Sequence, residues 1–211
     1  AGTFTNSTLP GGNILQEKFQ LRYSSDVLRT SVELAKKARD DHWAVAHTKP
    51  GSLRPLVAAS VGRAGDTLSH WTGATDPTTA GHGLPDEAVS LYYRRKLLAL
   101  CRAKPDLLAL ETLPGAREAR LALGALSDVA HELAKLGLQV PPSWVSFDCT
   151  NETSTAAGDD VGTLAAEFAQ HPAVHAVGLN CVSPALVEPL LTHACAHAPP
   201  GALLATATPC D

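Results

Sequence analysis

Two short stretches of this chain place reactive side chains directly after apolar runs. The run over residues 174–179 ends in Asn180 and Cys181, and the run over residues 107–110 ends in Glu111. A cysteine thiolate is both a nucleophile and a metal ligand. A glutamate without a partner is almost never fully buried, so its position does not suit a plain core strand. We therefore interpret the two stretches as parts of one candidate site.

The rest of the sequence predicts the elements that position these residues. Short Leu-rich or β-branched runs alternate with longer stretches of helical periodicity, which predicts parallel strands linked by crossover helices. Ser25 and Ser183 are expected N-caps, and Gly137 is the expected C-terminal glycine of a helix. Strands are expected at 55–62, 106–114, 143–150, 174–181 and 202–209, with a strand remnant at 1–7, and helices at 25–41, 86–103, 116–136, 161–170 and 184–197.

Polar and thiol side chains gather at one end of the expected strands. Strands that are apolar on both faces need cover on both sides, as in a barrel or a doubly wound sheet. In either architecture ligands bind at the carboxyl ends of the strands. The pattern therefore predicts a ligand site on that rim. The residues expected there are Ser60, Gly62, Glu111, Thr112, Asp148, Cys149, Asn180, Cys181 and Cys210.

The composition indicates one globular domain over residues 1–211. The chain is 45% hydrophobic with a formal net charge of −4 and no basic stripe, which argues against nucleic acid as a partner. Its apolar runs are too short to cross a bilayer, and its first residues lack a signal-peptide pattern. Five cysteines, an odd number, favour thiols in a reducing compartment such as the cytoplasm over a disulfide framework.

Several motifs, in order and at consistent spacing, resemble the homocysteine S-methyltransferases, which are zinc-dependent (β/α)8-barrel enzymes. The family's Asp-x-x-x-x-Glu-Thr strand is matched by Asp106, Glu111 and Thr112, and its Gly-x-Asn-Cys strand end is matched by the stretch GLNC at 178–181. The stretch SVGRAG at 60–65 resembles the family's Ser-x-Gly turn. The resemblance covers residues 25–204 and implies a barrel of the TIM type.

Two segments of the family pattern have no counterpart in this sequence. One is the Asp-Gly-Gly end of the first strand, whose aspartate contacts substrate. The other is the Gly-Gly-Cys-Cys segment of the eighth strand, which supplies two of the three zinc thiolates. The resemblance therefore implies a barrel truncated at both ends, with about six of eight strands. Open sheet edges favour association, so an oligomer or a completing chain is an expected partner.

The resemblance implies methyl transfer to the thiol of homocysteine. That thiol is mostly protonated at neutral pH, and zinc deprotonates and holds it. In-line attack on a sulfonium donor, S-methylmethionine or S-adenosylmethionine, then gives methionine and needs positioning more than acid catalysis. Zn is the implied cofactor and Cys181 its ligand. The implied substrate contacts are Ser60, Glu111, Thr112 and Asn180.

Each of these assignments has a structural alternative. Cys181 could be a small buried hydrophobe, Glu111 could cap a helix or pair with an arginine, and Asn180 could end its strand through local hydrogen bonds. Cys149 and Cys210 also follow strands, and they would join Cys181 in a three-thiolate site only if all three share a register.

Three functions remain open at the level of the sequence. The first is a homocysteine S-methyltransferase that acts on small-molecule substrates. The second is a catalytically inactive relative that acts as a binding or regulatory protein. The third is a barrel completed by another chain.

Overall fold

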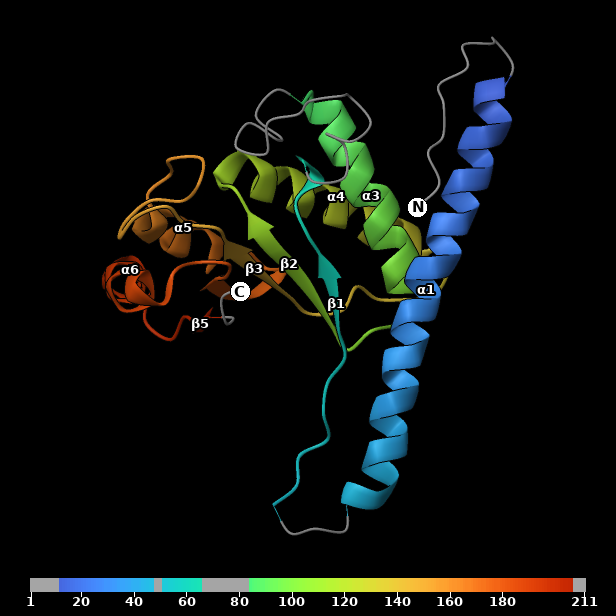
Figure 1. Cartoon of the computed structure of the whole chain (residues 1–211), viewed down its shortest axis with the longest axis horizontal. Coiled ribbons are helices and arrows are strands. Elements are labelled where there is room, and N and C mark those ends of the chain that lie inside the picture. The colour runs from blue at the N-terminus through green and yellow to red at the C-terminus, as the bar shows by residue number, and fades with distance from the viewer. Residues whose placement is uncertain (1–11, 48–50, 66–83, 207–211) are drawn as a thin grey trace.

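Five parallel strands form one sheet in which each strand pairs with the next along the chain. The computed structural model describes residues 12–47, 51–65 and 84–206. Its strands are β1 (Ala58–Val61), β2 (Leu107–Leu113), β3 (Ser143–Phe147), β4 (Val174–Leu179) and β5 (Leu204–Thr206), in the order β1-β2-β3-β4-β5 (Figure 1). A doubly wound sheet reverses its strand order at a switch point. The order here does not reverse, so the strands succeed one another as in a barrel.

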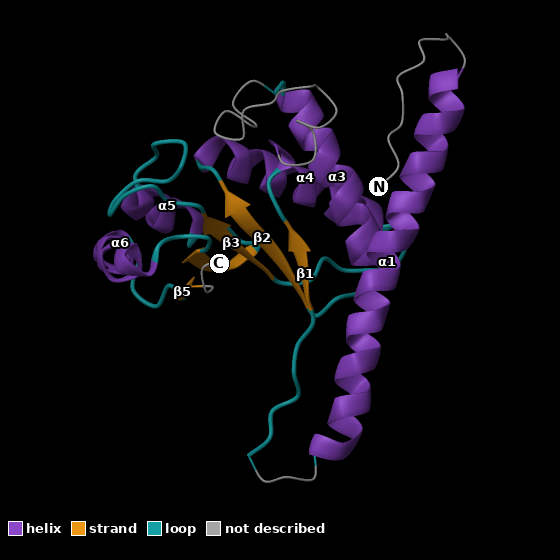
Figure 2. Ribbon diagram, in the orientation of Figure 1, coloured by secondary structure: helices purple, strands orange, loops and turns teal. Residues whose placement is uncertain are grey.

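Helices alternate with the strands, as the sequence predicts. The helices are α1 (Gly12–Ala46), α3 (Asp86–Arg102), α4 (Ala116–Ala134), α5 (Val161–Phe168) and α6 (Pro184–His197). Figure 2 shows α3 and α4 toward one end of the row of strands and α5 and α6 toward the other. The five expected strands from 55 onward and the five expected helices are confirmed, with shorter strands. The expected remnant at 1–7 lies outside the described residues. No helix in the described ranges is long and apolar enough to cross a membrane.

The core lies between the strands and the helices that follow them. Leu108, Leu110 and Phe147 are almost completely buried on β2 and β3. Ala119 and Ala122 of α4 are buried as well, and such small side chains let a helix pack close to its neighbours. The strand ends are thus held by a packed layer rather than by loops alone.

The first helix differs from the expectation. It extends from Gly12 to Ala46 instead of over 25–41, so the prediction that Ser25 is its N-cap is wrong. Serine is only mildly unfavourable inside a helix, so it need not begin one. Arg39 fixes α1 to the sheet: this buried guanidinium pairs with the carboxylate of Asp106, which also accepts a 2.7 Å hydrogen bond from the backbone N–H of Val57.

The ends of the later helices agree with the predictions more closely. Gly137 adopts a left-handed φ of 68°, and its N–H donates to the carbonyl of Ala134, as expected for a glycine that ends a helix. Ser183 holds the N-cap position of α6, although its side chain makes no cap hydrogen bond. The α5 N-cap is Asp160, whose carboxylate accepts hydrogen bonds from the N–H of Thr163 at 2.7 Å and from Nε2 of His193 at 2.7 Å.

Asp160 should make stability depend on pH in the acid range. The Thr163 N–H, followed by His193, lowers the pKa of Asp160 to about 2. Folding thus favours the charged form of Asp160. The contribution of this carboxylate to the free energy of unfolding is therefore present above about pH 4 and is lost as the pH falls through about 2. We expect Asp160→Ala to cost about 1 kcal/mol near pH 6, as for other N-caps, and progressively less below pH 4. Urea unfolding at several pH values measures this, with the exposed Glu152→Ala as control. A loss of equal size at all pH values would contradict the assignment.

A close approach fixes the start of α4 against the loop that follows β3. Gly115 lies at the N-cap of α4, and a Cβ atom there would lie 2.7 Å from the Cβ of Ala157 and would also meet the carboxylate of Asp159. That carboxylate accepts a 2.8 Å hydrogen bond from the N–H of Ala116. The absent side chain at 115 is thus what lets Asp159 cap the helix.

Substitution of this glycine should therefore be costly. We expect Gly115→Ala to lower the free energy of unfolding by about 2 kcal/mol, in the range of overpacking mutations. Gly124→Ala, on the same helix, is the matched control. The Cβ atom added there would meet no atom from outside its own helical turn within 4 Å. The control should stabilise the protein by about 0.5–1 kcal/mol through helix propensity. Denaturant unfolding of both variants measures the difference, and equal effects would refute the steric argument.

Candidate active site at the carboxyl ends of the strands

The side chain of Asn180 joins the carboxyl ends of three neighbouring strands. Its Oδ1 accepts a 2.8 Å hydrogen bond from the N–H of Thr112 on β2 and a 2.7 Å hydrogen bond from the hydroxyl of Ser146 on β3. Its Nδ2 donates to Oγ1 of Thr112 at 2.6 Å, and Sγ of Cys181 lies 3.4 Å from the same nitrogen. These contacts use both acceptor and both donor positions of the amide. Asn180 is buried, so the network is shielded from water.

Two residues of this network have an unusual backbone. Thr112 has a φ of 59° and Cys181 a φ of 54°, and neither is glycine. The left-handed region costs an L-residue about 1–2 kcal/mol. The pairing of β2 with β3 shifts register between Leu110 and Leu113, so Thr112 lies in an irregularity of the strand. Strained backbone of this kind persists where surrounding contacts enforce it, and it clusters at functional sites.

The thiol of Cys181 lies at the edge of this network. Cys181 is half-buried, and Oγ1 of Thr112 is 3.9 Å from its sulfur. Since Thr112 Oγ1 accepts from Asn180, its own hydroxyl hydrogen can point toward the sulfur. The structure thus brings together the predicted residues Thr112, Asn180 and Cys181, with polar groups directed at the thiol.

A second pair of predicted residues meets on β1 and β2. The hydroxyl of Ser60, an exposed residue, donates to Oε1 of the half-buried Glu111. Arg63, in the turn after β1, lies with its Nη1 3.5 Å from Oδ2 of Asp148, the residue after β3. The rim thus carries carboxylates, a guanidinium and hydroxyls, all from strand ends or the loops that follow them.

The other candidate thiols are placed differently. Cys149 is buried with its sulfur 3.8 Å from the carbonyl oxygen of Phe147, and burial, followed by the charge of Asp148, raises its pKa to about 12. Cys210 lies outside the described residues. Within the described part of the chain, no three His, Cys, Asp or Glu side chains form a group that could hold a metal. Cys181 by itself does not fit zinc, which takes four ligands.

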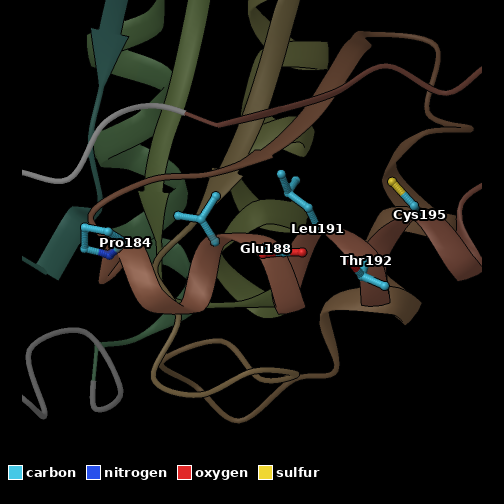
Figure 3. A pocket seen from close by; sticks show the side chains of 6 residues that line it. Pro184, Glu188, Leu191, Thr192 and Cys195 are labelled. Carbon is cyan, nitrogen blue, oxygen red and sulfur yellow. The ribbon is translucent and has the colours of Figure 1, made fainter.

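A separate hollow of about 570 Å³ lies along α6 rather than among the strand-end residues (Figure 3). Its lining residues all belong to one helix: Pro184, Val187, Glu188, Leu191, Thr192 and Cys195. It carries apolar side chains beside one carboxylate, with none of the network that surrounds Asn180.

Sequence reasoning missed Ser146 and Arg63 as contributors to this rim, and it did not identify Glu118 as a buried carboxylate. Nothing in the sequence distinguishes Ser146 from Ser143, the other buried serine of β3. Glu118 lies in the first turn of α4 and is only 4% exposed.

Successive parallel βα units with a thiol, an amide and a carboxylate at their carboxyl ends define a barrel-type α/β protein with a candidate ligand site at the rim. A sequence profile described as homocysteine S-methyltransferase matches residues 3–209, almost the whole chain. The chain therefore belongs to the homocysteine S-methyltransferase family.

Individual relatives agree with this assignment. Homocysteine S-methyltransferase 1 of Zea mays is 29% identical over 187 residues, which are 88% of this chain and 54% of that protein. Homocysteine S-methyltransferase 4 of Zea mays is 34% identical over 170 residues, 80% of this chain and 47% of that protein. The chain thus spans about half the length of these curated relatives.

Solved structures confirm an incomplete barrel-type α/β fold. The metallated form of the homocysteine methyltransferase MmuM from Escherichia coli superimposes with a TM-score of 0.68 at 27% identity. The match covers 89% of this chain and 59% of that one. Its apo form gives a TM-score of 0.66 over the same share of this chain.

Removal of the Asn180 amide should lower the free energy of unfolding by more than the loss of an exposed amide would. We expect Asn180→Ala to lower the free energy of unfolding by about 3 kcal/mol, because it leaves the buried Ser146 hydroxyl and the Thr112 N–H without their acceptor. Asn151→Ala is the matched control. The amide of Asn151 accepts from the N–H groups of Thr153 and Ser154 in an exposed loop, so its loss should cost about 1 kcal/mol or less. Urea unfolding compares the two, and similar losses would contradict a central role for Asn180.

Proposed function

We propose that this chain provides the acceptor side of a homocysteine S-methyltransferase. The observation that carries the proposal is the convergence of Thr112, Asn180 and Cys181 at one strand-end network, beside the Ser60–Glu111 pair. These are the residues through which the sequence resembles the family. The relatives of this chain include a selenocysteine Se-methyltransferase from Brassica oleracea var. italica, to which it is 30% identical over 178 residues. Both kinds of enzyme move a methyl group to an amino acid that carries a chalcogen.

In this proposal each rim residue has a separate task. The Glu111 carboxylate receives the ammonium group of homocysteine, and Ser60 orients that carboxylate through its hydrogen bond. Thr112 offers its hydroxyl to the acceptor. Asn180 acts indirectly, because its hydrogen-bonding positions are used by Thr112, Ser146 and Cys181.

The proposed reaction is a displacement at carbon. The acceptor sulfur, after loss of its proton to solvent, forms a bond to the methyl carbon as the carbon–sulfonium bond breaks. S-Methylmethionine or S-adenosylmethionine is the proposed donor, and it leaves as a neutral thioether while the acceptor becomes methionine. The protein contributes alignment and the exclusion of water, which can lower the barrier of such a step by several kcal/mol.

Zinc is proposed as the metal, with Cys181 as one ligand. When bound, zinc would keep the acceptor thiol deprotonated. The described residues hold no group of three possible ligands, so the set around Cys181 would be completed from outside them, by Cys210 or by another polypeptide. Among the described cysteines, Cys101, Cys149, Cys181 and Cys195 form no disulfide, which suits the cytoplasm as the proposed compartment.

One observation favours a second candidate, in which another polypeptide completes the barrel. Within the described residues β5 pairs with β4 on one side only, and the hollow along α6 presents Val187 and Leu191 close to that edge of the fold. An unpaired strand edge beside apolar side chains invites pairing with a further βα unit. A binding or regulatory protein without activity is the remaining alternative.

Direct assay separates these functions. We expect the purified chain to convert L-homocysteine to methionine with a sulfonium donor, measured by mass spectrometry, and to contain zinc. Cys181→Ser should lower both the zinc content and the rate by at least about 100-fold, as for metal-site losses. Cys195→Ser, an exposed thiol on α6, is the matched control and should behave as the unmodified chain.

The other outcomes each point to one alternative. Zinc and activity that appear only in an oligomer, or only after addition of a second polypeptide, favour completion by another chain. Homocysteine binding without zinc or turnover favours the inactive relative. Absence of homocysteine binding in every form refutes the proposed function.

A further inference from the structure

We propose that Glu118, a buried carboxylate outside the strand-end network, positions the β1 side of the acceptor site by holding the turn over residues 60–64. This inference rests on the proposed function and adds to it a positioning residue. Glu118 does not touch the rim groups itself. It acts through Ala64, the last residue of that turn.

The contacts of Glu118 connect three elements. Its Oε1 accepts a 2.5 Å hydrogen bond from the N–H of Ala64 and a 2.7 Å hydrogen bond from the hydroxyl of Tyr93. Glu118 belongs to α4, Tyr93 to α3, and Ala64 to the segment after β1, where a helical stretch begins at Ala64. Glu118 is 4% exposed, while Tyr93 and Ala64 are completely buried. The contact is therefore inaccessible to water and cannot be replaced by it.

A carboxylate is a costly choice for this position if its task is only to fill space. Burial of a charge costs several kcal/mol unless hydrogen bonds and dipoles compensate, and apolar side chains of similar volume often stabilise a fold better. Glu118 is compensated by two donors and by its place in the first turn of α4, where the helix dipole favours negative charge. Unlike an apolar side chain, a carboxylate accepts a directional hydrogen bond, and this bond fixes the position of the Ala64 N–H.

The turn that Glu118 holds carries the β1 contribution to the site. Ser60 at the start of the turn donates to Glu111, and Arg63 next to Ala64 lies 3.5 Å from Asp148. Between them the carbonyl of Gly62 accepts a 3.1 Å hydrogen bond from the hydroxyl of Tyr92. The turn is thus tied from the helix layer at Gly62 and Ala64, while its polar side chains face the rim.

Tyr93 strengthens this arrangement as a permanent donor. Burial, followed by the charge of Glu118, raises the pKa of Tyr93 well above its usual value, so the hydroxyl keeps its proton. Loss of the Tyr93 hydroxyl should leave the Ala64 contact in place, whereas loss of the Glu118 acceptor removes both. This difference distinguishes tethering of the turn from simple packing of α3 on α4.

The test compares Glu118 variants with a control residue of similar burial that lies at the amino ends of the strands, away from the rim. Glu118→Met removes the acceptor, Glu118→Gln keeps a neutral one, and Tyr93→Phe removes one donor. Ser143→Ala is the control. Ser143 is the first residue of β3, is 1% exposed, and donates a hydrogen bond to the carbonyl of Ala173. Two quantities are measured on the full chain: hydrogen exchange of the Ala64 amide, and the Kd for L-homocysteine by calorimetry.

We expect Glu118→Met to speed exchange at Ala64 and to weaken homocysteine binding, each by about tenfold, as for the loss of one hydrogen bond to a charged group. Glu118→Gln should show a smaller change in the same direction. Tyr93→Phe and Ser143→Ala should leave the Kd within about twofold even where they lower the melting temperature. If Ser143→Ala weakens binding as much as the Glu118 variants do, the positioning role is refuted.

The two measurements also separate this inference from the proposed function. If the unmodified chain does not bind homocysteine, the proposed function fails, and the exchange rate of Ala64 still decides whether Glu118 holds the turn. If homocysteine binds but the Glu118 variants change neither quantity, only the inference is overturned. Glu118→Gln, the mildest change, keeps this comparison available if Glu118→Met does not fold.

Discussion

The rim of this protein depends on the side chain of Asn180. Strand ends leave the regular ladder of backbone hydrogen bonds, so their relative positions must be set by other contacts. Asn180 sets them for β2, β3 and β4 through Thr112 and Ser146. Asn180 also helps to stabilise the left-handed backbone of Thr112, because Asn180 Oδ1 accepts the hydrogen bond from the N–H of that residue. The thiol of Cys181 is oriented as part of the same arrangement.

Charged groups hold the surrounding layers at two levels of the sheet. At the amino ends of the strands, buried Arg39 joins α1 to Asp106. At the carboxyl ends, Glu118 joins α4 and α3 to the turn after β1. In both places a side chain with little exposure meets backbone groups or a carboxylate, and such contacts constrain the geometry. The candidate site is therefore held in place by contacts that lead from the helices to the segment after β1 and from there to the rim.

The sequence predicts the framework better than the contacts. Helical periodicity and apolar runs locate helices and strands because burial follows those periods directly. Glu111, Asn180 and Cys181 were identifiable because polar residues that end apolar strands must lie on one rim. Ser146 and Glu118 were not, since their importance depends on the register of separate strands and on a turn that folds over α4. The early start of α1 was missed because Ser25 is compatible with both a cap and a helix interior.

Binding of the acceptor and binding of the metal are separable demands in this structure. In the proposed function the amino acid part of homocysteine needs a carboxylate and hydroxyls in fixed positions, and Ser60, Glu111 and Thr112 are the described residues proposed to provide them. Zinc needs several ligands at once, and Cys181 is the one strand-end thiol there that is not buried in the core. Partial burial of Cys181, with its sulfur beside polar groups, keeps that thiol accessible to the proposed metal, whose ligand set is completed from outside the described residues. In the proposed function, an acceptor wall that forms independently of the metal site would select the substrate by its amino acid part and leave activation of the thiol to the metal.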